Sequence, residues 1–247
     1  IYVGSGSVFD GGDGAGSSGF RGRGIWYSSD NGDTFTMVDG TDPGEFNNGS
    51  YSATDALVAD PTDDSKVWFG SNNDYGFLIE GVISEMPGSA GGPPAGVGDI
   101  AIAPDGSYML IGALNSKVYR STSSDFDDFE LIASGSGING NLPGAGINRV
   151  RVAISQNTEG DSYAFALYAD GNSFFGGLYV SDQDGEEGTW DECWPDGSLF
   201  TPLERSQGYY DLALGISKSQ PELAYVGGIS LWRLSLIHIS EPTRPMN

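Results

Sequence analysis

The chain has 247 residues, of which 38% are hydrophobic and 12% aromatic, enough apolar material for a sizeable core. Its 34 acidic and 11 basic residues give a formal net charge of −23, so its surface repels nucleic-acid phosphates and anionic membranes. The 39 glycines predict many turns rather than long helices, and no stretch approaches the roughly 20 apolar residues that would insert in a membrane.

Cysteine and histidine are almost absent from the chain. The single cysteine, Cys193, excludes an intramolecular disulfide, and the single histidine, His238, leaves little room for histidine-based catalysis or metal binding. We therefore expect no cofactor and no metal. An acidic chain of this kind fits an extracellular or cell-surface location, where salt screens its self-repulsion. The first residue is Ile1 rather than Met, so the lack of a signal peptide carries no information.

The sequence repeats one pattern of short strands, without the apolar spacing near 3.6 that predicts helices. Each unit has an apolar first strand, a polar turn, an apolar second strand that ends in a small residue, a third strand with an aromatic residue and a short fourth strand. In chain order, the strands are expected at 1–4 and 24–27; 56–58, 66–70 and 76–79; 100–102, 108–112, 117–120 and 129–132; 150–154, 163–168, 177–180 and 189–190; and 210–214, 224–228 and 231–232.

The small residue that ends the second strand recurs in every unit, at Gly4, Gly70, Gly112, Ala166 and Gly227. Four short strands in about 40–50 residues, with loop insertions, are typical of β-propeller blades. The sequence therefore predicts an all-β fold: a β-propeller of four-stranded antiparallel blades, as an incomplete arc of about four to five blades over residues 1–233. Blade boundaries are expected near 50, 96, 145 and 207. Because an open arc exposes two blade faces, we expect the chain alone to be poorly soluble.

A motif of eight residues, Ser-Ser-Asp-Asn-Gly-Asp-Thr-Phe at 28–35, follows the expected strand at 24–27. Ser28 and Asp30 can accept hydrogen bonds from backbone N–H groups, and Gly32 allows a positive φ. Thr34 and Phe35 complete the hairpin, with Phe35 expected to pack on the blade. A longer second copy contains Ser181, Asp184, Gly185, Thr189 and Trp190, and a third copy at 121–129 keeps only its ends.

The motif at 28–35 resembles the Asp-box (BNR repeat) of sialidase-like and sortilin-like β-propellers. In that family the box lies between the third and fourth strands of a blade, on the rim and away from the central pocket. The resemblance therefore implies a structural hairpin, and Asp30 is not expected to be catalytic. The last unit, at 208–232, also resembles blades of large secreted Bacteroidota proteins, many of them type IX secretion cargo. That resemblance implies other domains in the same full-length chain.

The last fourteen residues, 234–247, differ in composition from the rest. They read LSLIHISEPTRPMN, which resembles a translated sequencing adapter. We expect this tail to be an artefact that interrupts the natural sequence near Arg233, and to be loosely held or bound to an open strand edge. His238 would then not belong to the natural protein.

Propellers bind ligands at the loops of one face and at the mouth of the channel. The long insertions at 7–22, 84–97 and 133–148 are expected to form such loops. We therefore expect a secreted or cell-surface module for binding, adhesion or scaffolding, with a polysaccharide or a protein as its ligand. The tryptophans in expected strands are interpreted as core residues: Trp26, Trp68, Trp190 and Trp232.

A truncated glycoside hydrolase of the sialidase-like or xyloglucanase-like type is the alternative. Arg149 and Arg151 share one side of an expected strand, so both could point at one anion, as in the arginine cluster of a sialidase-like enzyme. A xyloglucanase-like enzyme uses two distant aspartates, but aspartate is too abundant here to indicate a pair. We therefore assign no catalytic residue and favour the non-catalytic module.

Overall fold

The computed structural model describes residues 1–8, 21–44, 50–85, 96–114, 117–133, 135, 137, 140–194, 207–209, 211–217, 220–228 and 230–235. Most of the insertions expected at 7–22 and 84–97 lies outside these ranges, as do parts of 133–148 and all of 236–247. The described residues form eighteen β-strands. Within these ranges we find no helix with the length and apolar character that a membrane crossing would require.

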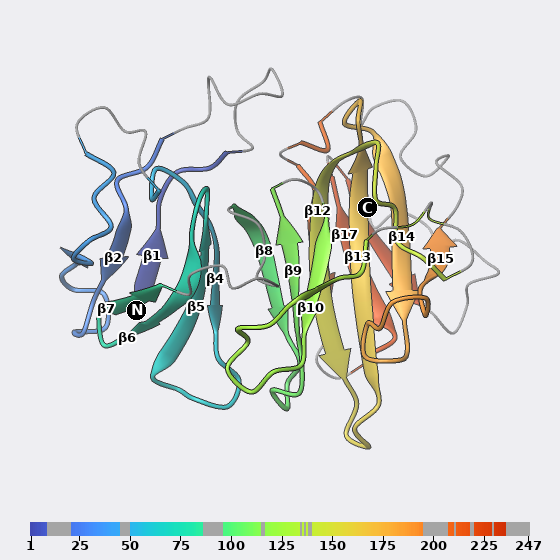
Figure 1. Cartoon of the computed structure of the whole chain (residues 1–247), viewed down its shortest axis with the longest axis horizontal. Coiled ribbons are helices and arrows are strands. Elements are labelled where there is room, and N and C mark those ends of the chain that lie inside the picture. Colours follow the sequence, from blue (N-terminus) through green and yellow to red (C-terminus); the bar gives the residue numbers. More distant parts are fainter. Residues whose placement is uncertain are drawn as a thin grey trace.

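The strands form five antiparallel sheets in which chain neighbours are paired. We call them blades I to V. Figure 1 shows blades I to IV following one another across the molecule, with β17 of blade V overlapping blade IV in this view. Blade I contains β1 (Tyr2–Gly4), β2 (Ile25–Tyr27) and β3 (Thr36–Met37); blade II contains β4 (Thr54–Ala59), β5 (Lys66–Ser71), β6 (Tyr75–Ile79) and β7 (Val82–Glu85); blade III contains β8 (Val97–Ile102), β9 (Met109–Ala113), β10 (Val118–Ser121) and β11 (Glu130–Leu131); blade IV contains β12 (Ile147–Gln156), β13 (Ser162–Asp170), β14 (Phe175–Ser181) and β15 (Asp191–Trp194); blade V contains β16 (Ala213–Ile216), β17 (Leu223–Gly227) and β18 (Leu231–Ser235).

The first strands of blades II to V, namely β4, β8, β12 and β16, contact one another in chain order and form the inner side of the arc. Strands β8 and β12 run in the same direction, because Arg151 lies beside Asp99 near their beginnings and Gln156 donates to Asp105 (2.8 Å) at their other ends. Strand β16 shares this direction, because Arg151 donates to the Leu212 carbonyl before it and Ser155 to the Pro221 carbonyl after it. We call the end where these strands begin the loop end, and the opposite end the turn end. The turn between β12 and β13 marks the turn end at the bottom of Figure 1.

One apolar cluster lies between each pair of neighbouring blades, so the core is divided into four layers. Trp68 is fully buried between blades II and III, and Trp190 is 1% exposed between blades III and IV. Trp26 and Trp232 are only half-buried, because they belong to the terminal blades of the arc. The expectation of four core tryptophans therefore holds for two of them.

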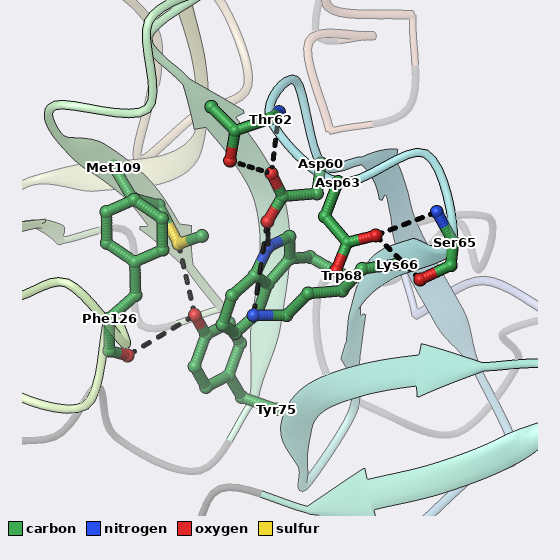
Figure 2. A network of polar contacts seen from close by, with 9 residues as sticks. All are labelled: Asp60, Thr62, Asp63, Ser65, Lys66, Trp68, Tyr75, Met109 and Phe126. Carbon is green, nitrogen blue, oxygen red and sulfur yellow. Dashed lines mark hydrogen bonds and ion pairs between the residues drawn. The ribbon is translucent and has the colours of Figure 1, made fainter.

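Figure 2 shows how polar groups complete the layer between blades II and III. Asp60 accepts hydrogen bonds from Thr62 (backbone N, 2.9 Å) and from the Trp68 indole (2.9 Å), and the Lys66 ammonium lies 3.9 Å away. Burial raises the pKa of Asp60, but these partners outweigh it and the net pKa is lowered. The Trp68 ring stacks on Tyr75, with 5.5 Å between ring centroids. This network lies at the turn end and has a structural role.

The strand positions follow the repeat with several differences. The first strand of blade V was expected at 210–214 and is found at Ala213–Ile216, and β3 and β7 had no expected range. The fourth strand of blade IV begins at Asp191, directly after the pair Thr189–Trp190 at which we expected it. The second strand β13 continues past Ala166 to Asp170, because the strands of blade IV are longer than those of the other blades. The last strand, β18, continues through Leu234 and Ser235, so these two residues of the expected tail lie in blade V. Leu234 is 7% exposed and belongs to the apolar layer between blades IV and V.

Candidate functional site

Three inner strands are irregular at the same place, close to their first residue at the loop end. The pairing register shifts between Thr54 and Ala56 in β4, between Val97 and Asp99 in β8, and between Ile147 and Arg149 in β12. Such β-bulges re-aim side chains and are frequent beside functional sites. They bring three charged residues to this end of neighbouring inner strands: Asp55, Asp99 and Arg149.

Arg151 joins three blades at the loop end. Its Nη1 atom lies 3.5 Å from Asp99 Oδ1 and donates to the Gly98 carbonyl (3.3 Å), and its Nε donates to the Leu212 carbonyl (3.1 Å). Asp99 Oδ2 also accepts a hydrogen bond from the backbone N–H of Val152 (2.9 Å). Asp99 and Arg151 are therefore paired with each other and held in place by the backbone groups around them.

Arg149 lies beside this pair and is 5% exposed. Its Nη1 donates to the Tyr209 carbonyl at 2.8 Å. Arg149 and Arg151 thus point to the same side of β12, towards the segment 207–212 that precedes β16. Both guanidinium groups are bound by carbonyl oxygens of this segment, and whether they also bind an anionic ligand stays a prediction.

Three carboxyl groups around these arginines have pKa values raised by burial. For Asp99 the Arg151 charge opposes the rise, and for Asp211 the Arg149 charge does so. For Asp55 the rise is opposed by hydrogen bonds from Ser7 and the backbone of Val8, and then by both arginines. Burial disfavours the charged form of a carboxyl group, and such groups collect at functional sites. We call Asp55, Asp99, Arg149, Arg151 and Asp211 the inner charged cluster.

A pocket of about 450 Å³ adjoins the inner charged cluster. Its walls come from β4, β8, β12 and β16, so four blades contribute to it. Asp99 and Arg151 are the charged residues of its lining, and the other lining residues are aliphatic, among them Ile100, Ile102 and Val152. An apolar pocket with a few convergent polar groups is the usual form of a small-molecule site.

The hairpin at 28–35 closes on itself at the turn end. Ser28 Oγ accepts from the Gly32 N–H (2.8 Å), and Asp30 accepts from the N–H (2.9 Å) and the hydroxyl (2.6 Å) of Thr34. The side-chain hydrogen bond from Thr34 is the main reason why the pKa of Asp30 is lowered to about 2. Phe35 remains 40% exposed, so it does not pack into the blade as expected. The hydrogen-bonding groups of the motif serve the turn itself and lie far along the strands from the inner charged cluster.

The second copy of the motif has a different arrangement from the one that we predicted. The two left-handed residues are Asn31 (φ 61°) and Gly32 in the first hairpin, and Asp184 (φ 53°) and Gly185 in the second. Asp184 therefore corresponds to Asn31, and Gln183 occupies the aspartate position. The Ser181 hydroxyl instead bonds the Thr189 hydroxyl at 2.6 Å, and Trp190 is buried below them.

Sequence reasoning identified Arg149 and Arg151 but missed the three aspartates beside them. A signal was present, since Asp55, Asp99 and Asp211 each stand directly before the apolar run of a first strand. The abundance of aspartate elsewhere hid this repetition. The bulges that turn Asp55 and Asp99 towards the inner side depend on pairing between strands, which the sequence does not display.

No protein-family model matches the sequence, and no curated protein matches it. Similar solved structures include an ancestral GH74 enzyme (TM-score 0.62, 16% identity, 95% of this chain and 32% of that one) and the Dos1 propeller (0.58, 11%, 99% and 58%). The GH74 xyloglucanase from Xanthomonas campestris is also similar (0.60, 17%, 90% and 35%).

The chain has a β-propeller fold. The predicted fold class is thereby confirmed, with its described residues forming an arc of antiparallel blades. The chain spans less than two thirds of the length of each of these proteins. At identities under 20%, the similarity concerns the fold and leaves the activity open.

Proposed function

We propose that this propeller arc is a binding module of a secreted or cell-surface protein, with a glycan as its ligand. The observation that carries the proposal is the inner charged cluster beside an apolar pocket that four blades share. The cluster lies at the loop end, and the pocket continues from it along the inner strands as far as Ile102 and Ile216. Propellers bind ligands at the loops of one face and at the mouth of the channel that the inner strands line. The ligand would lie against the inner strands, between Asp99 and Arg151 on one side and the aliphatic wall on the other.

The chemistry of the pocket suits a sugar. A pyranose ring has C–H faces that pack on aliphatic side chains and hydroxyl groups that donate hydrogen bonds. Carboxylate oxygens accept such hydrogen bonds, and Asp99 provides them in the lining of the pocket, with Asp55 and Asp211 beside it in the inner charged cluster. Two similar folds belong to GH74 enzymes, one of them described as a xyloglucanase, which supports testing a plant-type polysaccharide first.

The setting of the module is part of the proposal. A net charge of −23 suits an extracellular environment and a ligand without strong negative charge. The same loop face could also bind a protein ligand. The proposal includes other domains in the same full-length chain. The resemblance to secreted Bacteroidota proteins also supports an extracellular location.

Binding to soluble xyloglucan tests the proposal. We expect the full chain to be retarded in native gels that contain xyloglucan, and Asp99→Asn to weaken this binding about tenfold by removing the charge that holds Arg151. Asp64→Asn, at an exposed position of the turn end, removes the same charge as a matched control and should bind normally. Equal binding by wild type and Asp99→Asn, with equal melting temperatures, would place the ligand elsewhere.

A glycoside hydrolase is the second candidate, and the raised pKa values of Asp55, Asp99 and Asp211 are the observation in its favour. A general acid must be protonated near the working pH, and burial favours protonation. We expect binding without release of reducing sugar. Release that disappears in Asp55→Asn, Asp99→Asn or Asp211→Asn would instead establish catalysis and identify its residue.

A further inference from the structure

An exposed phenylalanine stands at the loop end of blade IV. Phe174 lies in the turn between β13 and β14, and 45% of its surface is exposed. Single exposed apolar residues are common on proteins, so exposure alone indicates nothing. The turn that carries Phe174 is unusual in how firmly it is fixed and in what it adjoins.

The turn is fixed by hydrogen bonds from both sides. Asp170 Oδ1 accepts from the N–H groups of Asn172 and Phe174, each at 2.9 Å, and the Asp170 N–H donates to the Phe174 carbonyl at 2.7 Å. Ser173 has a φ of 65°, in the left-handed region that non-glycine residues rarely adopt. Strain of this kind persists only where the surroundings enforce it, and it is frequent at ligand sites.

Ser173 connects this turn to two other segments of the loop end. Its hydroxyl accepts a hydrogen bond from Asn148 Nδ2 (2.6 Å), and its carbonyl accepts one from the Gly208 N–H (2.8 Å). A side chain at Gly208 would come within 2.9 Å of the Ser173 carbonyl, so the two segments lie as close as backbones can. The backbone around Phe174 is therefore held on three sides.

The same contacts join Phe174 to the inner charged cluster. Tyr209 follows Gly208 directly, and its carbonyl binds the Arg149 guanidinium at 2.8 Å. Asp211 is two residues further on, and the Arg149 charge opposes the rise that burial causes in its pKa. Phe174 thus presents an apolar ring at the loop end, on a rigid support that continues into the cluster.

We propose that Phe174 is a stacking platform for a pyranose ring of a neutral polysaccharide that extends from the inner charged cluster across the loop end. The proposal rests on the proposed glycan-binding function and names a residue and a ligand class for it. The flat apolar ring suits the C–H face of a sugar, and the fixed turn lowers the entropy lost on binding. Both cluster arginines are already bound by carbonyl groups, and the chain carries a net charge of −23, so an acidic polysaccharide is disfavoured.

The test compares Phe174→Ala with Phe35→Ala in the full chain, using xyloglucan and polygalacturonate as probes. Phe35 is a matched control because it is 40% exposed and lies at the opposite, turn end of a blade. We expect Phe174→Ala to weaken xyloglucan binding about tenfold, Phe174→Trp to retain it, and Phe35→Ala to leave it unchanged. Melting temperatures of all variants should stay close to that of the wild type, because Phe174 and Phe35 are both exposed and neither belongs to an apolar layer between blades.

The outcomes separate this inference from the proposed function. A wild-type chain that binds xyloglucan while Phe174→Ala binds it equally well would refute the platform and leave the glycan site in place. A wild-type chain that binds neither probe would refute the proposed function itself. Tighter binding of polygalacturonate than of xyloglucan would refute the neutral ligand class.

Discussion

At the scale of single residues, a buried serine stands at the start of the hairpin that follows β2, β10 and β14. Ser28, Ser121 and Ser181 are each at most 2% exposed. Their hydroxyl oxygens accept hydrogen bonds from the backbone N–H groups of Gly32 (2.8 Å), Ser123 (3.3 Å) and Gln183 (3.1 Å). The serine fixes the hairpin even where the rest of the motif has changed. It is therefore a more constant feature of the repeated hairpin than the aspartate is.

Asp30 adds a pH-dependent contribution to this turn. Its folded-state pKa, about 2, is below the ordinary value of 3.8, so its stabilisation is complete above the unfolded pKa and is lost as the pH falls towards 2. We expect Asp30→Asn to lower the melting temperature at neutral pH by a few degrees. The decline of the melting temperature between about pH 4 and pH 2 should also be shallower than in the wild type.

Asp33→Asn is the control for this change, because it removes a charge from the same turn, where the described residues show no hydrogen bond to the Asp33 carboxylate. Thermal unfolding followed by circular dichroism over this pH range measures the melting temperatures of both variants and of the wild type. If Asp30→Asn and Asp33→Asn behave alike, the turn draws its stability from the serine alone.

At the scale of strands, the glycine at the end of the second strand has a packing reason in the first three blades. A Cβ atom added at Gly4 would lie 2.8 Å from Thr54, and one added at Gly112 would lie 3.2 Å from Val150. In each case the neighbour belongs to the first strand of the next blade. The repeat therefore records the closest approach between blades, which explains why alignment of these residues predicted the strand order.

Gly70 is the most demanding of these positions. Its added Cβ would lie 2.5 Å from Val97 Cγ1 and 2.9 Å from the Val97 carbonyl, so backbone would have to move. We expect Gly70→Ala to destabilise the chain by about 1–3 kcal/mol, the usual cost of overpacking. Gly215→Ala is the control, since its nearest neighbour would be 4.0 Å away, and it should be neutral. Urea unfolding of both variants measures the difference; an unchanged midpoint for Gly70→Ala would contradict the packing account.

Local sequence patterns predicted the strands of the blades but not the inner charged cluster. Strand positions followed from short apolar runs and the turn residues between them, because these are local properties of the chain. The inner charged cluster did not, because Asp99 meets Arg151 only after blades III and IV have packed. The displacement of Asp184 from the aspartate position likewise became visible only through its φ of 53°.

At the scale of the whole molecule, the face of blade I that points away from blade II is apolar and uncovered in the described structure. Tyr2 and Tyr27 point to blade II, while Val3 lies on the opposite face, paired with Trp26, and is 44% exposed. The corresponding faces of blades II to V are each covered by the preceding blade. An uncovered apolar face of this kind promotes association.

We expect the chain to self-associate through this face, and Val3→Lys to reduce the association by placing a charge in its centre. Val82→Lys is a matched control, because Val82 is 66% exposed on the outer strand of blade II, away from this face. Added salt should promote association of the wild type, because it screens the repulsion between chains of net charge −23. Sedimentation velocity over a range of concentrations measures both effects. A wild type that stays monomeric, or equal association of the wild type and Val3→Lys, would show that the exposed face of blade I is tolerated without a partner.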